Sequence, residues 1–236
     1  MNIRHSVKRH AAGWALPLAL CATSIAIAGS ASAQNYSPDI LELDGVETLA
    51  FPPTDQINLA KGGAIEFWIA ADWGEGLEYD PPAVINIGEE GISYLVSIMR
   101  DRDGIVFSNA DAEAVFLADL SDGRLHHITI NVMEDGIVAY VDGQLVGTSE
   151  IRPMDLPSSG LFVGGLDAEG AYRFTGAIGQ LRIWGEPLFE EDIEDFRMLD
   201  VLNEEGDDHP DIANLKALSD FAAKELVLVE NVEEIE

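Results

Sequence analysis

The sequence predicts an all-β protein, a two-sheet antiparallel β-sandwich (jelly roll) with a C-terminal helical extension. Short apolar runs recur between Ile40 and Trp184, each bounded by Gly, Pro or Asp. Such turn signals at a spacing of roughly 8–12 residues are typical of sandwiches and jelly rolls. After Pro187 the composition becomes acidic, with apolar residues at helical spacing. We therefore expect a signal segment over 1–33, a sandwich over 34–200, and a linker with a helical tail over 201–236.

Residues 1–33 have the pattern of a secretory signal peptide. Three basic residues precede a largely apolar run over 11–28, and Ala31-Ser32-Ala33 offers small residues for cleavage. Pro17 interrupts the run, which argues against a retained membrane anchor, and the residue before Cys21 fits lipid attachment poorly. We therefore expect an exported protein, periplasmic or extracellular, with no stable insertion in a membrane.

The acidic balance limits the partners. Of 13 basic and 43 acidic residues, residues 1–33 carry three basic and no acidic ones, so the remaining chain has a formal net charge of −33. Such a charge excludes nucleic acid and anionic membranes as natural partners. The single cysteine, Cys21, lies in the signal segment, so the exported chain must be held by its core without disulfides.

The expected sandwich strands follow one another with turns between them. In the stretch AIEFWIA, the alternation directs Ile65, Phe67 and Ile69 to one face of the strand and Glu66 and Trp68 to the other. Covering loops can also bury the tryptophans of the second face. The runs, in order, are ILEL, AIEFWIA, AVINIG, SYLVSIM, IVFSN, AVFLADL, LFVGG and GAIGQLRIW.

Two helical stretches are expected after the sandwich. LFEEDIEDFRML, from Leu188, has the pattern of a short amphipathic helix. An acidic linker follows, and then a tail with Ile212, Leu215, Leu218 and Phe221 at helical spacing. The tail can dock on the sandwich, pair with a partner or fray, and the pattern leaves these three outcomes open.

The adjacent His126 and His127 are first candidates for a metal or acid/base site. Neighbouring residues on a strand point to opposite faces, so the two rings cannot converge on one ion. Asp135-Gly136 and Asp142-Gly143 follow, and Asp-Gly is favoured in tight hairpin turns. We expect His126 to be partly buried in the sandwich, His127 to lie at the surface, and both aspartates to serve turns.

The stretch LHHITINVMEDGIVAYVDGQLVG resembles the signature of laminin-G-like, concanavalin-A-like jelly-roll domains. The resemblance extends over most of 41–196 through LELDG, AIEFWIA, LFVGG and FTGAIGQLRIWGEPLFEEDI. It implies the same sandwich and a role as a carbohydrate-binding, adhesive or protein-recognition module. Many relatives hold a structural calcium with an acidic residue where this chain has Gly179-Gln180, so calcium is doubtful, and Asp44 is a weak candidate ligand. No other cofactor is expected.

Catalysis is disfavoured. Glycosidases need two carboxylates flanking a sugar bond, whereas the acidic cluster over 190–196 lies in the expected helix. We therefore predict a secreted, non-catalytic module that binds carbohydrate through loops. The alternatives are a protein-interaction or adhesion domain of an envelope complex and, less favoured, a glycoside hydrolase or lyase; the oligomeric state stays open. The candidate glycan-binding residues are Trp73, the leading one, with Tyr79, Asn109, Asp167, Tyr172 and Arg173.

Overall fold

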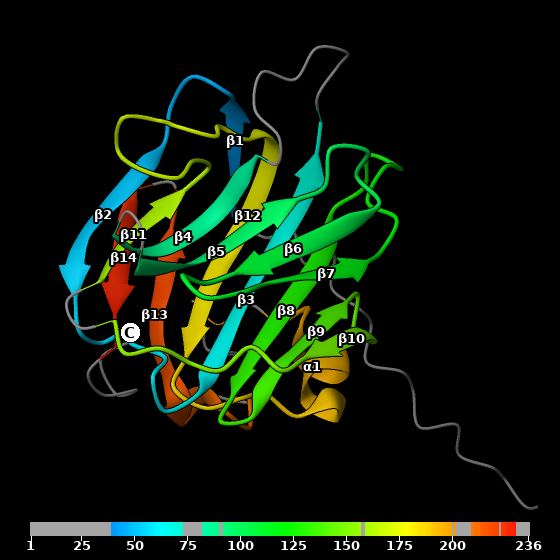
Figure 1. Cartoon of the computed structure of the whole chain (residues 1–236), viewed down its shortest axis with the longest axis vertical. Helices are drawn as coiled ribbons and strands as arrows, with labels where there is room; N and C mark the ends of the chain where they lie inside the picture. The colour runs from blue at the N-terminus through cyan, green and yellow to red at the C-terminus, as the bar shows by residue number, and fades with distance from the viewer. Residues whose placement is uncertain are drawn as a thin grey trace, which may run out of the picture. The chain divides into compact units, whose positions relative to one another are not determined.

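The computed structural model describes residues 39–72, 82–89, 92–156, 159–199, 201, 209–221 and 223–229. The expected signal peptide over 1–33 lies outside them. Within the described residues the chain forms two antiparallel sheets packed face to face, with one short α-helix after the twelfth strand. The predicted all-β sandwich is therefore confirmed (Figure 1).

In the described part of the chain, one sheet has eight strands in the order β10-β9-β8-β3-β12-β13-β14, with β1 also pairing with β12. β12 is its longest strand, and one of its edges pairs with β1 along 175–179 and with β13 along 182–184. The bounds are β1 Ile40–Asp44, β3 Gly63–Ala71, β8 His126–Met133, β9 Gly136–Val141, β10 Gln144–Ser149, β12 Thr175–Trp184, β13 Leu215–Asp220 and β14 Glu225–Leu228.

The second sheet has six strands among the described residues, in the order β2-β11-β4-β5-β6-β7. Its strands cross those of the first sheet in projection (Figure 1). The bounds are β2 Leu49–Thr54, β4 Ala83–Glu89, β5 Ile92–Ile98, β6 Gly104–Ser108, β7 Glu113–Leu117 and β11 Ser159–Val163.

The main hydrophobic core lies between the two sheets. On β3, Ile65, Phe67 and Ile69 are fully buried in it, as the alternation predicts. Tyr94 and Phe107 enter it from the six-stranded sheet, with ring centroids 5.8 Å apart. Burying each large apolar side chain stabilises the fold by roughly 1.5–3 kcal/mol, so this interface holds the sandwich without disulfides.

A second hydrophobic cluster covers the outer face of the eight-stranded sheet. It joins Trp184 on β12 with Leu188 and with Ile193 of helix α1 (Glu190–Phe196), so the predicted short amphipathic helix is confirmed. Trp68 and Trp184 are 7% and 0% exposed, because this face is covered. Both faces of the eight-stranded sheet are therefore buried in this region.

The helical tail expected over 201–236 is wrong for the residues described there. After the 3-10 turn Ile212–Asn214, the chain forms β13 and then β14. The second half of β12 would otherwise leave its backbone groups unpaired, and β13 satisfies them. A short isolated helix is marginal in water, so this tertiary pairing outweighs the helical spacing. Of the three outcomes that the pattern leaves open, the described residues show docking on the sandwich, as strands.

Candidate functional site

The two adjacent histidines lie in separate surroundings, as strand alternation predicts. The His126 ring lies between two turn carboxylates, with Nδ1 2.9 Å from Asp142 Oδ2 and Nε2 3.0 Å from Asp122 Oδ1. Asp142 has φ +53° and its Oδ1 accepts a hydrogen bond from the backbone N–H of His127. Asp142 therefore serves the hairpin turn, and the rings do not form a joint metal site.

His127 is fully buried, so its expected surface position is wrong. Its face of β8 lies under the second hydrophobic cluster, and Nε2 is 2.8 Å from Glu66 Oε1 on β3. Glu66 also accepts hydrogen bonds from Trp184 Nε1, at 2.9 Å, and from Arg182 Nη1, at 3.4 Å. Every member of this buried ion cluster (Glu66, His127, Arg182 and Trp184) thus comes from an outward-facing position of three neighbouring strands.

The electrostatics of the ion cluster indicate a structural role. Burial alone would raise the pKa of Glu66, but the Arg182 charge and the hydrogen bonds from His127 and Trp184 lower it to about 2. Burial also lowers the pKa of His127, so its ring is neutral at pH 7. Glu66 is therefore a carboxylate with its oxygens engaged and no access to solvent, which suits packing rather than ligand binding.

The outer face of the six-stranded sheet differs, because its side chains reach solvent. On β7, Val115 and Leu117 are 47% and 69% exposed. A pocket of about 270 Å³ lies on this face and mixes apolar and hydroxyl side chains with one carboxylate. Its lining residues are Leu95, Ser97, Val106, Ser108, Glu113, Leu166 and Tyr172. We call this pocket the sheet groove.

Tyr172 is the candidate residue that the structure places at the sheet groove. Its side chain is 44% exposed although its backbone has φ +52°, a conformation that costs a non-glycine residue about 1–3 kcal/mol. The backbone is held there because Tyr172 O accepts a 2.7 Å hydrogen bond from Ala83 N. Asn86 Nδ2 donates to Leu166 O at 2.6 Å and anchors the same loop over β4. The fold thus holds an exposed aromatic ring at the groove.

Asp167 and Asn109 are engaged in local backbone structure. Asp167 Oδ1 accepts a hydrogen bond from Ala171 N at 3.1 Å, which closes the turn before Tyr172. Asn109 Oδ1 accepts from Ala112 N at 3.0 Å, and its Nδ2 donates to Arg152 O at 3.2 Å. Both side chains therefore shape loops near the groove, and neither is among the residues that line it.

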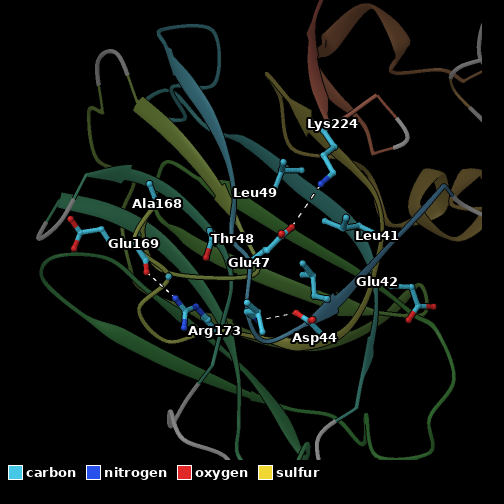
Figure 2. A pocket seen from close by; sticks show the side chains of 13 residues that line it. Leu41, Glu42, Asp44, Glu47, Thr48, Leu49, Ala168, Glu169, Arg173 and Lys224 are labelled. Atoms are coloured by element: carbon cyan, nitrogen blue, oxygen red, sulfur yellow. Dashed lines mark hydrogen bonds and ion pairs between the residues drawn. The ribbon is translucent and has the colours of Figure 1, made fainter.

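Arg173 lines a different pocket (Figure 2). This pocket of about 650 Å³ lies between β1, the β1–β2 turn, residues 168–173 and Lys224. Its cations already have partners: Arg173 Nη2 donates to Glu169 O at 3.0 Å, and Lys224 Nζ is 3.8 Å from Glu47 Oε2. The structure therefore separates Arg173 from Tyr172, although the two are adjacent in sequence.

The described residues give Asp44 a local role in the turn after β1. Asp44 Oδ1 accepts a hydrogen bond from Val46 N at 2.9 Å, and no group of three or more His, Cys, Asp or Glu side chains in the described ranges could hold a metal ion. Gln180, which stands where relatives are expected to carry an acid, is buried and accepts a hydrogen bond from Arg182 Nε at 2.8 Å. That a structural calcium is doubtful stays a prediction.

Two candidates, Trp73 and Tyr79, lie outside the described residues. Sequence reasoning named Tyr172 as a candidate and did not name the sheet residues beside it in the groove, including Ser97 and Ser108. Their signal was present, because both occupy the polar positions of strands whose alternate residues are apolar. What the sequence could not show is which sheet keeps its outer face open.

A family model described as the concanavalin A-like lectin/glucanases superfamily, laminin G type, matches residues 44–194. A search of curated proteins finds none that matches. No helix among the described residues is long and apolar enough to cross a membrane.

Several solved structures share the fold at low sequence identity. A candidate carbohydrate-binding protein from Bacteroides ovatus is 17% identical with a TM-score of 0.53, over 76% of this chain and 52% of that one. Domain 4 of the Geobacillus stearothermophilus arabinanase AbnA, in complex with arabinotriose, is 13% identical with a TM-score of 0.51, over 66% and 74%. The sialidase module CBM40 of Ruminococcus gnavus, bound to α2,3 sialyllactose, is 12% identical with a TM-score of 0.50, over 66% and 96%. This chain thus spans about half of the Bacteroides chain.

Proposed function

This chain belongs to the concanavalin A-like lectin/glucanases superfamily, and from this premise we propose that it is a non-catalytic carbohydrate-binding module. The ligand binds at the sheet groove, on the outer face of the six-stranded sheet. Fold membership alone does not determine function, so the proposal is argued from the groove itself.

The exposed ring of Tyr172 is the observation that carries the proposal. A tyrosine offers an apolar face and a polar hydroxyl, which suits a ligand that presents both C–H surface and hydroxyl groups. The positive φ of Tyr172 and its backbone hydrogen bond with Ala83 fix the main chain that carries the ring. Less backbone conformational freedom is therefore lost on binding. A strained, solvent-facing aromatic residue that no core requires is a reason to infer function.

The floor of the groove complements such a ligand. Ser108 can donate and accept hydrogen bonds, and Glu113 can accept them from sugar hydroxyls, above a buried Ser97. Leu95 and Val106 supply apolar contact between these polar groups. The volume of about 270 Å³ is near the lower end of ligand pockets, so the groove holds a short portion of a glycan whose remainder extends over the sheet.

The groove does not provide the chemistry of glycoside hydrolysis. Retaining and inverting glycosidases place two carboxyl groups about 5–10 Å apart across the scissile bond. Among the described residues that line the groove, Glu113 is the one carboxylate. The sialidase module and the arabinanase domain, whose folds this chain shares, are parts of glycan-active enzymes, which supports a binding role. Export, which rests on residues 1–33, remains part of the proposal.

Binding to a glycan array and to insoluble polysaccharides tests the proposal. We expect wild-type protein to bind and Tyr172→Ala to lose about five- to tenfold in affinity, since one aromatic contact contributes on the order of 1–1.5 kcal/mol. Phe189→Ala is the matched control, because Phe189 is 71% exposed and does not line the groove. Failure of the wild type to bind any glycan would contradict the carbohydrate proposal and favour a protein ligand.

A further variant addresses the leading sequence candidate. Trp73→Ala removes one of the two aromatic residues of the 73–81 segment and leaves the residues that line the sheet groove in place. Unaltered glycan binding by this variant removes only the role predicted for Trp73. Equal losses in Trp73→Ala and Phe189→Ala would show that the assay responds to surface aromatics in general, and would overturn the assignment to Tyr172.

A further inference from the structure

The C-terminal strap, His209 to Val229, is a separate feature from the sheet groove and lies beyond the family match at 44–194. It extends the eight-stranded sheet through β13 and β14 and buries Leu215, Leu218, Phe221 and Val229. Ser219 Oγ accepts a hydrogen bond from Leu181 N at 2.8 Å, at the irregularity of β12. The strap therefore completes the sheet, and its attachment begins at His209.

His209 is the first residue of the strap. Its ring nitrogen Nδ1 is unprotonated, because it accepts a hydrogen bond. Its side chain is nearly fully buried, with its ring centroid 4.7 Å from that of Trp184 and 5.3 Å from that of Phe196. Its Nδ1 accepts a 3.1 Å hydrogen bond from Asp211 N. Its own carbonyl accepts one from Ile212 N at the same distance, and these bonds shape the 3-10 turn that leads into β13.

We propose that His209 is an acid-sensitive latch, whose protonation at Nδ1 releases the C-terminal strap from the sandwich. A proton on Nδ1 turns the acceptor into a donor that faces the amide N–H of Asp211. The hydrogen bond is then lost, and a charge is placed in a buried site between two aromatic rings. Opening the strap returns the imidazolium to water.

Charged groups from three neighbouring elements surround this ring. Glu66 on β3 and Asp192 on α1 favour the imidazolium, whereas Arg182 on β12 disfavours it. The Trp184 face also favours a cation. Burial outweighs them and lowers the pKa of His209, because the oxygens of Glu66 are already engaged by the other members of the ion cluster.

The remaining titratable groups nearby act in the same region. His127, beside Glu66, Arg182 and Arg197, is also kept neutral by burial. Asp211 follows His209, and burial, Asp192, Glu186 and Glu66 raise its pKa. A test of the latch must therefore separate His209 from His127 and from Asp211.

The sign of the effect follows from linkage. The closed strap holds His209 with a lowered pKa, so closure is most stable above the ordinary histidine pKa of about 6.5 and weakens as the pH falls below it. For each unit by which the pKa of His209 in the open strap exceeds its pKa in the closed strap, protonation raises the ratio of open to closed strap by up to about tenfold.

Hydrogen exchange of the intact chain at pH 7.5 and pH 5, expressed as protection factors, tests the proposal. We expect protection over 211–220 to fall severalfold or more at pH 5 while the central strand β8 stays protected. Unchanged protection of the strap, or equal loss of protection in β8, would overturn a local latch.

Three variants identify the titrating group. His209→Asn keeps an acceptor for Asp211 N in an uncharged side chain, so its strap should show no pH response. His127→Gln and Asp211→Asn should retain the wild-type response. A full response in His209→Asn, or its loss in Asp211→Asn alone, would assign the switch to another group and reject the latch.

Discussion

The two sheets of this sandwich have outer faces with opposite surroundings. The eight-stranded sheet carries Glu66, His127 and Arg182 on its outer face, and all three are no more than 1% exposed. The six-stranded sheet carries Leu95, Ser97 and Ser108 on its outer face, beside an exposed Tyr172. The face with the buried ion cluster is thus the covered one, and the face with the sheet groove, which includes the carboxylate of Glu113, is the open one.

This difference teaches that residue polarity alone does not locate the functional face of a sandwich. Charges on the covered face are paired with one another and fix how the C-terminal residues pack. The sheet groove on the open face can instead meet a ligand. The same architecture therefore uses one face for stability and leaves the other for recognition.

The largest expected difference in stability between the two faces comes from removing one carboxylate from each. Glu66→Ala leaves Arg182 buried without its counter-charge, so we expect a loss of about 3–5 kcal/mol in the free energy of unfolding, measured with urea. Glu113→Ala on the open face should change it by less than about 0.5 kcal/mol. Similar losses in both variants would show that the two faces do not differ as described.

An intermediate effect is expected from pH. The contribution of Glu66, with its pKa of about 2, is complete above pH 4.5 and is lost only as the pH falls from there toward 2. The buried histidines have lowered pKa values, so their contributions are complete above about pH 6.5 and decline below it. Urea midpoints should therefore fall between pH 7 and pH 5. A midpoint that is constant over this range and falls only below pH 4.5 would assign acid sensitivity to the carboxylates instead.

The smallest effect on stability belongs to the open face. Tyr172→Gly relieves the positive φ, so the free energy of unfolding should rise by up to about 1 kcal/mol while glycan binding is lost. Phe189→Gly, at an exposed N-cap with φ −74°, has no positive φ to relieve and should change the free energy of unfolding by less than about 0.5 kcal/mol. Thermal melting of the two variants measures both shifts. Destabilisation of Tyr172→Gly would mean that the ring packs for stability.

Strand alternation predicted much of the fold. It separated His126 from His127, and it placed Ile65 and Phe67 in the core with Glu66 on the opposite face. It could not show that this opposite face is covered, because the cover comes from residues more than 100 positions later in the chain. The burial of His127 was missed for the same reason, although Trp68 beside it was a signal that the face is not fully solvated.

The C-terminal residues show the limit of local patterns. Leu215 and Leu218 fit a helix by spacing, yet they belong to a strand because the edge of β12 needed a partner. Tyr172 was identified as an aromatic residue in a glycine-containing loop, whereas its relation to Ser97 and Ser108 depends on tertiary structure. Trp73 and Tyr79 remain predictions.

The division of the β12 edge between β1 and β13 has a consequence for the order of folding. β1 and β13 are separated by about 170 positions in the chain, yet each supplies half of the partner that β12 requires on that side. Contacts between such distant segments slow folding, because long loops must close before they form. When the chain is synthesised from its N-terminus, the half of this edge that pairs with β13 stays unpaired until β13 has been made. During that interval β12 is the segment most exposed to wrong pairing, and assistance that shields an unpaired strand edge would act there.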